Sequence, residues 1–117
     1  MELAIIDDDP VEHLILRELA TAIRPGIEVS GFISVEHFLD ANPDRFDLVF
    51  LDRRLPPIEA YSESLPLISE AGYSGHIVLM TADNSEVRDD RYAFRVSGPI
   101  DKIELIRGQK LAALLAA

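Results

Sequence analysis

The sequence predicts an α/β domain in which helices cover both faces of a doubly wound, five-stranded parallel sheet. Short apolar runs typical of strands alternate five times with longer amphipathic stretches typical of helices. The connections are short, and short connections in such a pattern favour parallel strands joined by right-handed crossovers. The length of 117 residues fits one domain, which we place at residues 1–117, and 48% hydrophobic with 27% charged residues is a globular composition.

The first half of the chain predicts two strands, each followed by a helix. An apolar strand over 3–6 runs into three aspartates, one of which caps a helix that has Pro10 in its first turn and ends at Pro25-Gly26. A second strand is expected over 27–33, and Ser34 caps a short helix through Leu39. The apolar stripe expected on the first helix consists of Val11, Leu14, Ile15, Leu19, Ala22 and Ile23.

The second half continues the alternation less regularly. The near-continuous apolar run 46–51 predicts a strand buried on both faces, and residues 76–81 predict another. Between them we expect a loop over 53–60 and a helix over 62–71, with Pro66 either in its first turn or kinking it. Towards the end the expected elements are a short helix near 85–92, a weak strand near 94–97, and a closing helix that starts at Pro99 and is weakened at Gly108.

Composition excludes several classes of function. The chain carries 11 Lys and Arg against 21 Asp and Glu, a net charge of −10, which argues against nucleic acid and anionic membranes as direct partners. The absence of Cys excludes disulfides, and the three histidines lack metal-ligand spacing, so we expect them at the surface or at strand edges. No apolar run reaches the roughly 20 residues of a membrane span, and no signal-peptide pattern is present, so we expect a cytoplasmic protein.

Polar residues follow three of the predicted strands directly. Ile6 runs into Asp7 and Asp8, Leu51 into Asp52, and Met80 into Thr81. Ligands of parallel sheets bind beyond the carboxyl ends of the strands, and neighbouring ends lie about 4.8 Å apart. Carboxylates gathered there repel one another, and Mg²⁺, which takes one or two carboxylates together with phosphate oxygens, offsets that repulsion. Helix capping alone is the simpler reading of the first acidic run, but a cap uses only one carboxylate.

The segments 5–10 (IIDDDP), 48–56 (LVFLDRRLP) and 77–82 (IVLMTA) carry a family resemblance. In this order and spacing, with a weaker match at 98–101, the chain resembles the receiver domain of response regulators in two-component systems. The resemblance implies a flavodoxin-like sheet with strand order 2-1-3-4-5. It also implies phosphorelay signal transduction, in which the domain is a phosphoprotein.

The resemblance also implies roles for individual residues. Asp52 matches the phosphoacceptor, which takes a phosphoryl group from a sensor histidine kinase or a histidine phosphotransfer protein. Asp8 and Asp52 match direct Mg²⁺ ligands, and the backbone carbonyl of Arg54 matches the third protein ligand. Asp7 matches a ligand that acts through water. Thr81 matches the switch hydroxyl that turns towards the phosphoryl group.

The match fails near the end of the chain. The family carries a lysine before a proline after the fifth strand, whereas this sequence has Gly98-Pro99, only 17 residues after Thr81. Lys102 is the nearest lysine and is expected inside the closing helix, while Arg91 and Arg95 are further candidates. The family's fifth-strand aromatic residue also lacks a clear counterpart, since the nearby aromatic side chains suit a core. Signalling through this region is therefore expected to be unusual.

The functional expectation is a stand-alone phosphoacceptor domain, not an enzyme, that acts on an unknown downstream protein through protein contacts. One alternative is a receiver-like interaction module that has lost phosphorylation, which the missing lysine supports. The other is a Mg²⁺-dependent phosphohydrolase that uses Asp52, which is disfavoured because Arg54 stands where a general acid is expected two residues after the nucleophile.

Overall fold

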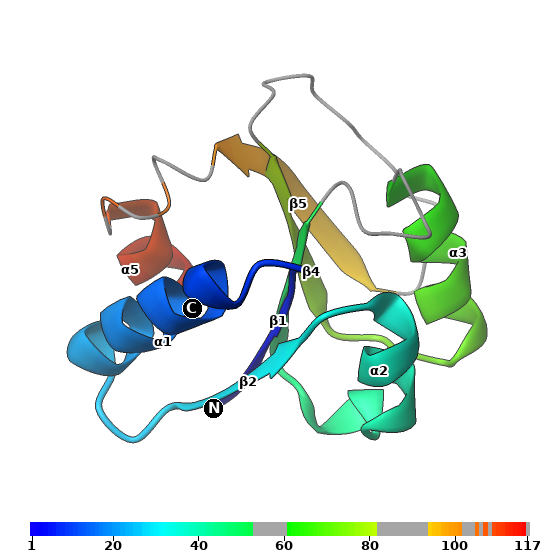
Figure 1. Cartoon of the computed structure of the whole chain (residues 1–117), viewed down its shortest axis with the longest axis horizontal. Coiled ribbons are helices and arrows are strands. Elements are labelled where there is room, and N and C mark those ends of the chain that lie inside the picture. Colours follow the sequence, from blue (N-terminus) through cyan, green and yellow to red (C-terminus); the bar gives the residue numbers. More distant parts are fainter. Residues whose placement is uncertain (53–60, 82–93, 102–104, 106, 108, 117) are drawn as a thin grey trace.

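A five-stranded, all-parallel sheet forms the centre of the molecule (Figure 1). The computed structural model describes residues 1–52, 61–81, 94–101, 105, 107 and 109–116. The strand order is β2-β1-β3-β4-β5, which confirms the predicted fold class and strand order. The strands are β1 (Glu2–Ile6), β2 (Glu28–Phe32), β3 (Leu48–Asp52), β4 (His76–Thr81) and β5 (Arg95–Asp101).

Helices cover both faces of this sheet (Figure 1). Helices α1 and α5 lie on one face, and α2 and α3 lie on the other. Among the described residues no helix combines the length and apolar character needed to cross a membrane. The helices are α1 (Pro10–Ile23), α2 (Val35–Asp40), α3 (Tyr61–Glu70) and α5 (Gln109–Leu115), with a 3-10 turn, η1 (Pro43–Arg45), between α2 and β3.

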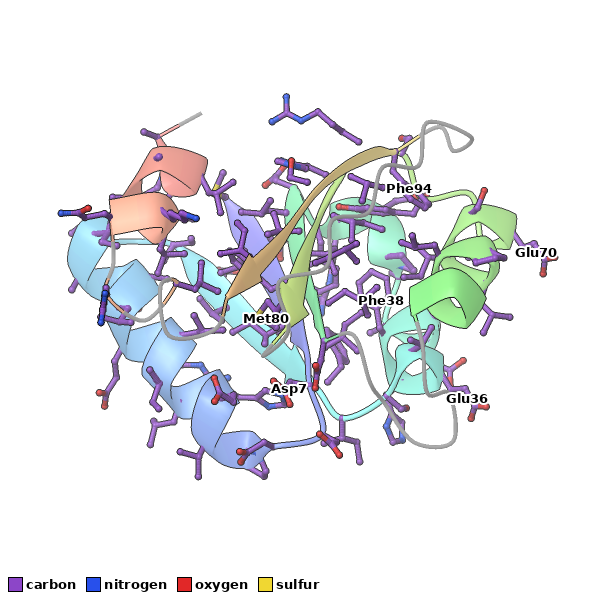
Figure 2. The ribbon with its side chains drawn as sticks, turned by 90° about the horizontal axis from the view of Figure 1, so that it is seen from above. Asp7, Glu36, Phe38, Glu70, Met80 and Phe94 are labelled. Atoms are coloured by element: carbon purple, nitrogen blue, oxygen red, sulfur yellow. The ribbon has the colours of Figure 1, made fainter. Side chains whose placement is uncertain are left out.

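The core divides into two layers because successive strand side chains point to opposite faces. Figure 2 shows Phe38 on the side of α2 and α3, and Met80 on the side of α1 and α5. The central strands are buried on both faces, as their apolar runs predict. Their contributions to the α2/α3 layer are Ala4, Ile6, Val49, Leu51, Ile77 and Leu79, and those to the α1/α5 layer are Leu3, Ile5, Leu48, Phe50, Val78 and Met80.

The starts of α1 and α2 agree with the sequence more closely than the buried face of α1 does. Asp9 caps α1 and Ser34 caps α2, as predicted. The apolar stripe predicted for α1 is only partly right. Leu19 packs against the core, but the fully buried residues are Leu16 and Ala20, which the predicted stripe left out. Val11 and Leu14 are 59% and 53% exposed. Apolar residues surround most of this helix, so periodicity alone does not determine which of them are buried.

Three further sequence predictions concern Pro66 and the segments 53–60 and 85–92. Pro66 lies inside α3 and not in its first turn, which decides between the two positions left open. The loop predicted over 53–60 and the short helix predicted near 85–92 lie outside the described residues.

The end of the chain departs from the prediction. The closing helix does not start at Pro99, because Pro99 lies within β5 and α5 begins at Gln109. β5 pairs only with β4, so it is an edge strand, where a residue without an N–H is tolerated. A bulge also accommodates Pro99: Ser97 pairs with Val78 and Ile100 with Met80, so two residues of β5 face one of β4.

Candidate metal and phosphoacceptor site

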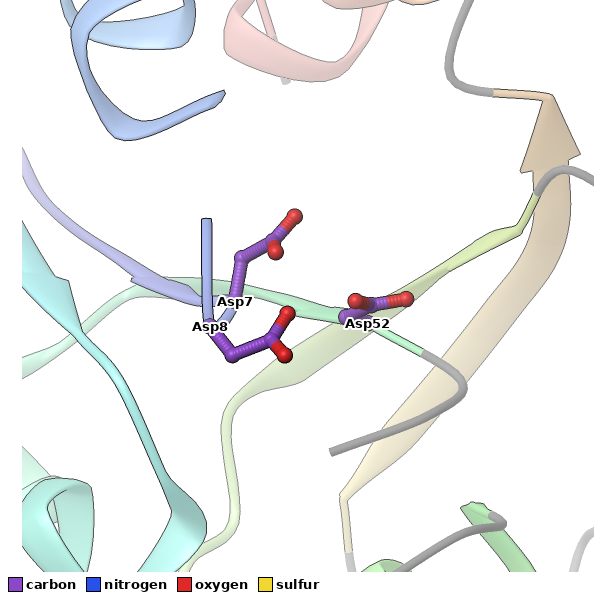
Figure 3. Close-up of side chains that lie close together, drawn as sticks. All are labelled: Asp7, Asp8 and Asp52. Atoms are coloured by element: carbon purple, nitrogen blue, oxygen red, sulfur yellow. The ribbon is translucent and has the colours of Figure 1, made fainter. Parts of the chain in front are cut away.

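Three carboxylates meet at the carboxyl ends of β1 and β3, which are neighbours in the sheet (Figure 3). Asp52 is the last residue of β3, and Asp7 and Asp8 follow the last residue of β1. One carboxylate oxygen from each of the three residues lies within 4.8 Å of the others. The expected gathering of acidic side chains at this edge is therefore present.

Hydrogen bonds hold the N–H, the carboxylate and the carbonyl oxygen of Asp7. Its N–H donates to the carbonyl oxygen of Phe32 in β2 at 2.9 Å. Its carboxylate Oδ1 accepts from the N–H of Asp9 at 3.0 Å, and its carbonyl oxygen lies 2.7 Å from Nε2 of His13. Because Asp9 also caps α1 by accepting from the N–H of Val11 at 3.0 Å, the acidic run is part of the start of that helix. Capping therefore occupies Asp9 and leaves Asp8 pointing towards Asp52 (Figure 3).

The charges of the three carboxylates favour a cation. Asp7 and Asp52 are only 0% and 8% exposed, whereas Asp8 is exposed. Two like charges at 4.8 Å repel by roughly 3 kcal/mol at an effective dielectric constant near 20. A hard divalent cation bound by the carboxylates would offset this repulsion.

The donor set suits Mg²⁺. Mg²⁺ takes only oxygen ligands in an octahedron with bonds of about 2.0–2.1 Å, so its ligand oxygens lie roughly 3–4 Å from one another. The three oxygens lie within 4.8 Å, and exposed Asp8 can close the remaining distance by a small side-chain movement. Zinc, which prefers nitrogen and sulfur ligands in structural sites, fits this all-carboxylate group less well.

Lys102 aside, one of the other predicted site residues lies at the same edge of the sheet, two lie outside the described residues, and one lies far from this edge. Thr81 is the last residue of β4, and its backbone pairs with Asp101 at the end of β5, on the same edge of the sheet as Asp52. Arg54 and Arg91 lie outside the described residues. Arg95 is the first residue of β5, six residues before Asp101 and thus about 20 Å from this edge, so it is excluded as a partner of the site.

The observed bounds of β5 change which residue corresponds to the family's lysine. Gly98-Pro99 lies inside β5 and not after it, so its comparison with the family's lysine and proline is wrong. Helix α5 begins at Gln109, seven residues after Lys102 in the sequence. Lys102 lies outside the described residues but directly follows Asp101, the strand partner of Thr81. The sequence therefore supplies a lysine immediately after the end of the fifth strand.

Among the described residues of this region, no aromatic side chain takes the place of the family's fifth-strand aromatic residue. Phe94 is 3% exposed and packs in the α2/α3 layer, with its ring centroid 6.2 Å from that of Tyr73. It precedes β5 and is therefore at the opposite edge of the sheet from Thr81. Tyr92 lies outside the described residues, and none of residues 95–101 of β5 is aromatic.

Sequence reasoning missed His13. It was expected at the surface or a strand edge, whereas it is partly buried against the backbone of Asp7. The spacing held a signal, because a residue in the first turn of α1 lies close to the acidic run that starts this helix.

No protein-family model matches the sequence, and no curated protein matches it. Solved structures do match. The RcsB response regulator of Salmonella typhimurium is 17% identical with a TM-score of 0.75, and the match covers 100% of this chain and 58% of that one. A response regulator receiver protein of Pseudoalteromonas atlantica is 15% identical with a TM-score of 0.69 and is covered over 100% of both chains.

A third similar structure is the receiver protein of Burkholderia phymatum, which is 24% identical with a TM-score of 0.60 and coverage of 98% of this chain and 94% of that one. The chain therefore has the fold of response regulator receiver domains. It spans little more than half the length of the RcsB chain.

Proposed function

We propose that this chain is a phosphoacceptor signalling domain that takes a phosphoryl group onto Asp52 in a Mg²⁺-dependent reaction. The observation that carries the proposal is the meeting of three carboxylates at the carboxyl ends of β1 and β3 in a receiver fold. The donor is a phosphohistidine of a sensor histidine kinase or a histidine phosphotransfer protein. The output is a change in contacts with a downstream protein.

Phosphoryl transfer to a carboxylate needs positioning and charge neutralisation more than it needs covalent help from the protein. A carboxylate oxygen of Asp52 attacks the phosphorus, the new P–O bond gives an acyl phosphate, and the P–N bond breaks with its electron pair returning to the imidazole. Asp8, Asp52 and the backbone carbonyl of Arg54 are the proposed direct ligands of Mg²⁺. Asp7 is proposed to act through water. When bound, Mg²⁺ supplies the positive charge that neutralises the phosphoryl oxygens.

Two residues are proposed to respond to the phosphoryl group. Phosphorylation adds roughly 1.5 to 2 negative charges and three acceptor oxygens. The hydroxyl of Thr81 would donate to one of these oxygens, and Lys102 would pair with the charge. A 100-fold shift between two conformations needs about 2.7 kcal/mol, which one or two charge-assisted hydrogen bonds can supply.

The test is covalent labelling by a small phosphoryl donor such as acetyl phosphate, followed by intact mass. We expect one phosphoryl group per chain with Mg²⁺, none with a chelator, and none in Asp52→Asn. Asp44→Asn removes the same charge from an exposed position in η1 and should label as the wild type does. Equal labelling of Asp52→Asn and wild type would refute the assignment of Asp52.

The same experiment separates the alternatives and tests the lysine. Mg²⁺ binding without labelling would indicate a receiver-like interaction module, and repeated turnover of a phosphate ester would indicate a phosphohydrolase. We expect Lys102→Met to label more slowly at unchanged Mg²⁺ affinity. Lys110→Met in α5 is the matched control and should label at the wild-type rate.

A further inference from the structure

We propose that His13 is a positioning residue that holds the Asp7–Asp8 peptide in place for Mg²⁺, and that Gly31 provides the space this requires. The inference deepens the proposed function and rests on it. It concerns three elements that meet beside the acidic pair: the start of α1, the end of β1 and strand β2.

The first step is the hydrogen bond from α1. Nε2 of His13 lies 2.7 Å from the carbonyl oxygen of Asp7. A carbonyl only accepts, so Nε2 carries the proton and donates. This carbonyl belongs to the peptide unit that joins Asp7 to Asp8, so its direction helps to set where the backbone of Asp8 begins. The bond from the N–H of Asp9 to the carboxylate of Asp7 closes a turn across the same peptide unit, and the His13 bond adds a restraint at its carbonyl oxygen.

The second step is the space that the ring occupies. A Cβ added at Gly31 would lie 2.5 Å from Nδ1 of His13 and 2.9 Å from its Cγ, so the imidazole packs directly against the backbone of β2. Glycine weakens a strand and often marks a close approach of another group. Gly31 pairs with Ile5 of β1, one residue before the Phe32 that bonds Asp7. Any larger residue here would displace the ring.

The third step is the consequence for the metal. Groups that orient metal ligands through hydrogen bonds typically change metal affinity by about 10- to 100-fold when removed. His13 acts on the backbone and not on a carboxylate, so we expect the lower end of this range of affinity changes. We expect His13→Ala to weaken Mg²⁺ binding about tenfold.

The experiment is Mg²⁺ titration by calorimetry combined with chemical denaturation. His13→Ala and Gly31→Ala should both bind Mg²⁺ more weakly, and Gly31→Ala should have no further effect in the His13→Ala background, because the ring it displaces is absent. His13→Gln keeps an N–H donor and should recover most of the affinity. His37→Ala in α2, whose ring bonds Ser34, is the matched histidine control and should bind as the wild type does.

Two readouts do not depend on bound metal. NMR of the metal-free protein should show the Nε2–H tautomer of His13, and hydrogen exchange at the amide of Asp8 should accelerate in His13→Ala but not in His37→Ala. A purely structural role predicts equal Mg²⁺ affinity in all variants at lowered stability, and that result would overturn the inference. The Nδ1–H tautomer would overturn it as well.

Failure of this inference differs from failure of the proposed function. If wild type binds Mg²⁺ and labels Asp52 while His13→Ala binds equally well, the positioning role is wrong and the function stands. If wild type neither binds Mg²⁺ nor labels, the function is wrong, and the metal site that His13 was inferred to position is wrong with it.

Discussion

Tyr73 is a residue whose environment makes a direct prediction. It is 2% exposed, and its hydroxyl donates to the carbonyl oxygen of Phe46 at 3.0 Å. Its ring packs edge-on against Phe38 at a centroid distance of 6.1 Å. Burial raises the pKa of Tyr73 to about 12, the Asp47 carboxylate adds to this, and a hydrogen bond from the backbone of His76 partly offsets it. The neutral phenol is therefore the form that the fold stabilises.

We expect Tyr73→Phe to lower the free energy of unfolding by about 1–2 kcal/mol at pH 8, because the carbonyl of Phe46 loses its donor in a buried place. The effect should depend on pH. Between pH 10, the ordinary pKa, and about 12, the unfolded chain loses the Tyr73 proton while the folded chain keeps it. The unfolded state then binds fewer protons, so the free energy of unfolding of the wild type falls as pH rises. Because one pKa unit corresponds to about 1.4 kcal/mol, the total fall is up to roughly 3 kcal/mol.

Urea unfolding of both proteins from pH 8 to 12 checks this prediction. All other titrating groups are common to the two proteins, so the difference between them isolates Tyr73. The advantage of the wild type should be present in full below pH 10 and shrink above it. An advantage that stays constant to pH 12 would show that the hydroxyl ionises in the folded state as it does in the unfolded chain.

At the scale of elements, Arg24 connects the two helices on one face of the sheet. It is the C-cap residue of α1, where its N–H bonds the carbonyl oxygen of Ala20 at 2.8 Å. Its guanidinium donates to the carbonyl oxygen of Leu115, the last residue of α5, at 2.9 Å. Carbonyl groups at helix ends lack intrahelical partners and carry partial negative charge, so a cation there is favourable.

We expect Arg24→Met to lower the free energy of unfolding by about 0.5–1.5 kcal/mol and to accelerate amide exchange in α5 more than in the central strands. Methionine retains an apolar stem but not the donor. Arg17→Met is the matched control, since it removes the same charge from α1 itself, where the guanidinium donates to the carbonyl oxygen of Val29 in β2 at 3.4 Å. Hydrogen exchange by mass spectrometry measures both. Equal acceleration of α5 in the two variants would mean that charge, and not the contact with Leu115, holds this helix.

Strands were the elements that the sequence predicted best, and the reason is burial. The central strands are covered on both faces, so their apolar runs are nearly unbroken and their ends are marked by Asp7, Asp52 and Thr81. These polar residues at the strand ends also made the acidic site predictable, because the carboxyl ends of parallel strands lie at one edge of the sheet. The proximity of Asp8 and Asp52 therefore follows from the sequence pattern alone.

The errors came from features with no local signal. Pro99 suits a helix start as well as an edge strand, and only the pairing of β5 with β4 selects the strand. The buried face of α1 depends on which layer it packs against, and that is a property of the sheet. The contact between His13 and Gly31 joins residues 18 positions apart, 31 − 13, through a glycine whose role appears only when the ring is seen beside it.

For the whole molecule, the negative charges outnumber the positive ones, and three of them, Asp7, Asp8 and Asp52, meet at one edge of the sheet. The net charge of −10 destabilises the compact state by self-repulsion. Salt screens such surface charges within about 8 Å at physiological ionic strength. The repulsion between buried Asp7 and Asp52 is screened much less, so a bound divalent cation and a monovalent salt should affect stability differently.

We therefore expect Asp52→Asn to unfold at a higher urea concentration than wild type in a chelator, because one of two buried like charges is gone. Mg²⁺ should reverse this order. At 100 times its dissociation constant it should stabilise the wild type by about 2.7 kcal/mol, and the variant by much less. Sodium chloride at matched ionic strength should shift both proteins equally. Asp44→Asn, which changes the same charge at an exposed position of η1, should respond to Mg²⁺ as the wild type does. If Mg²⁺ stabilises Asp52→Asn as strongly as the wild type, the cation binds elsewhere and the acidic edge is not its site.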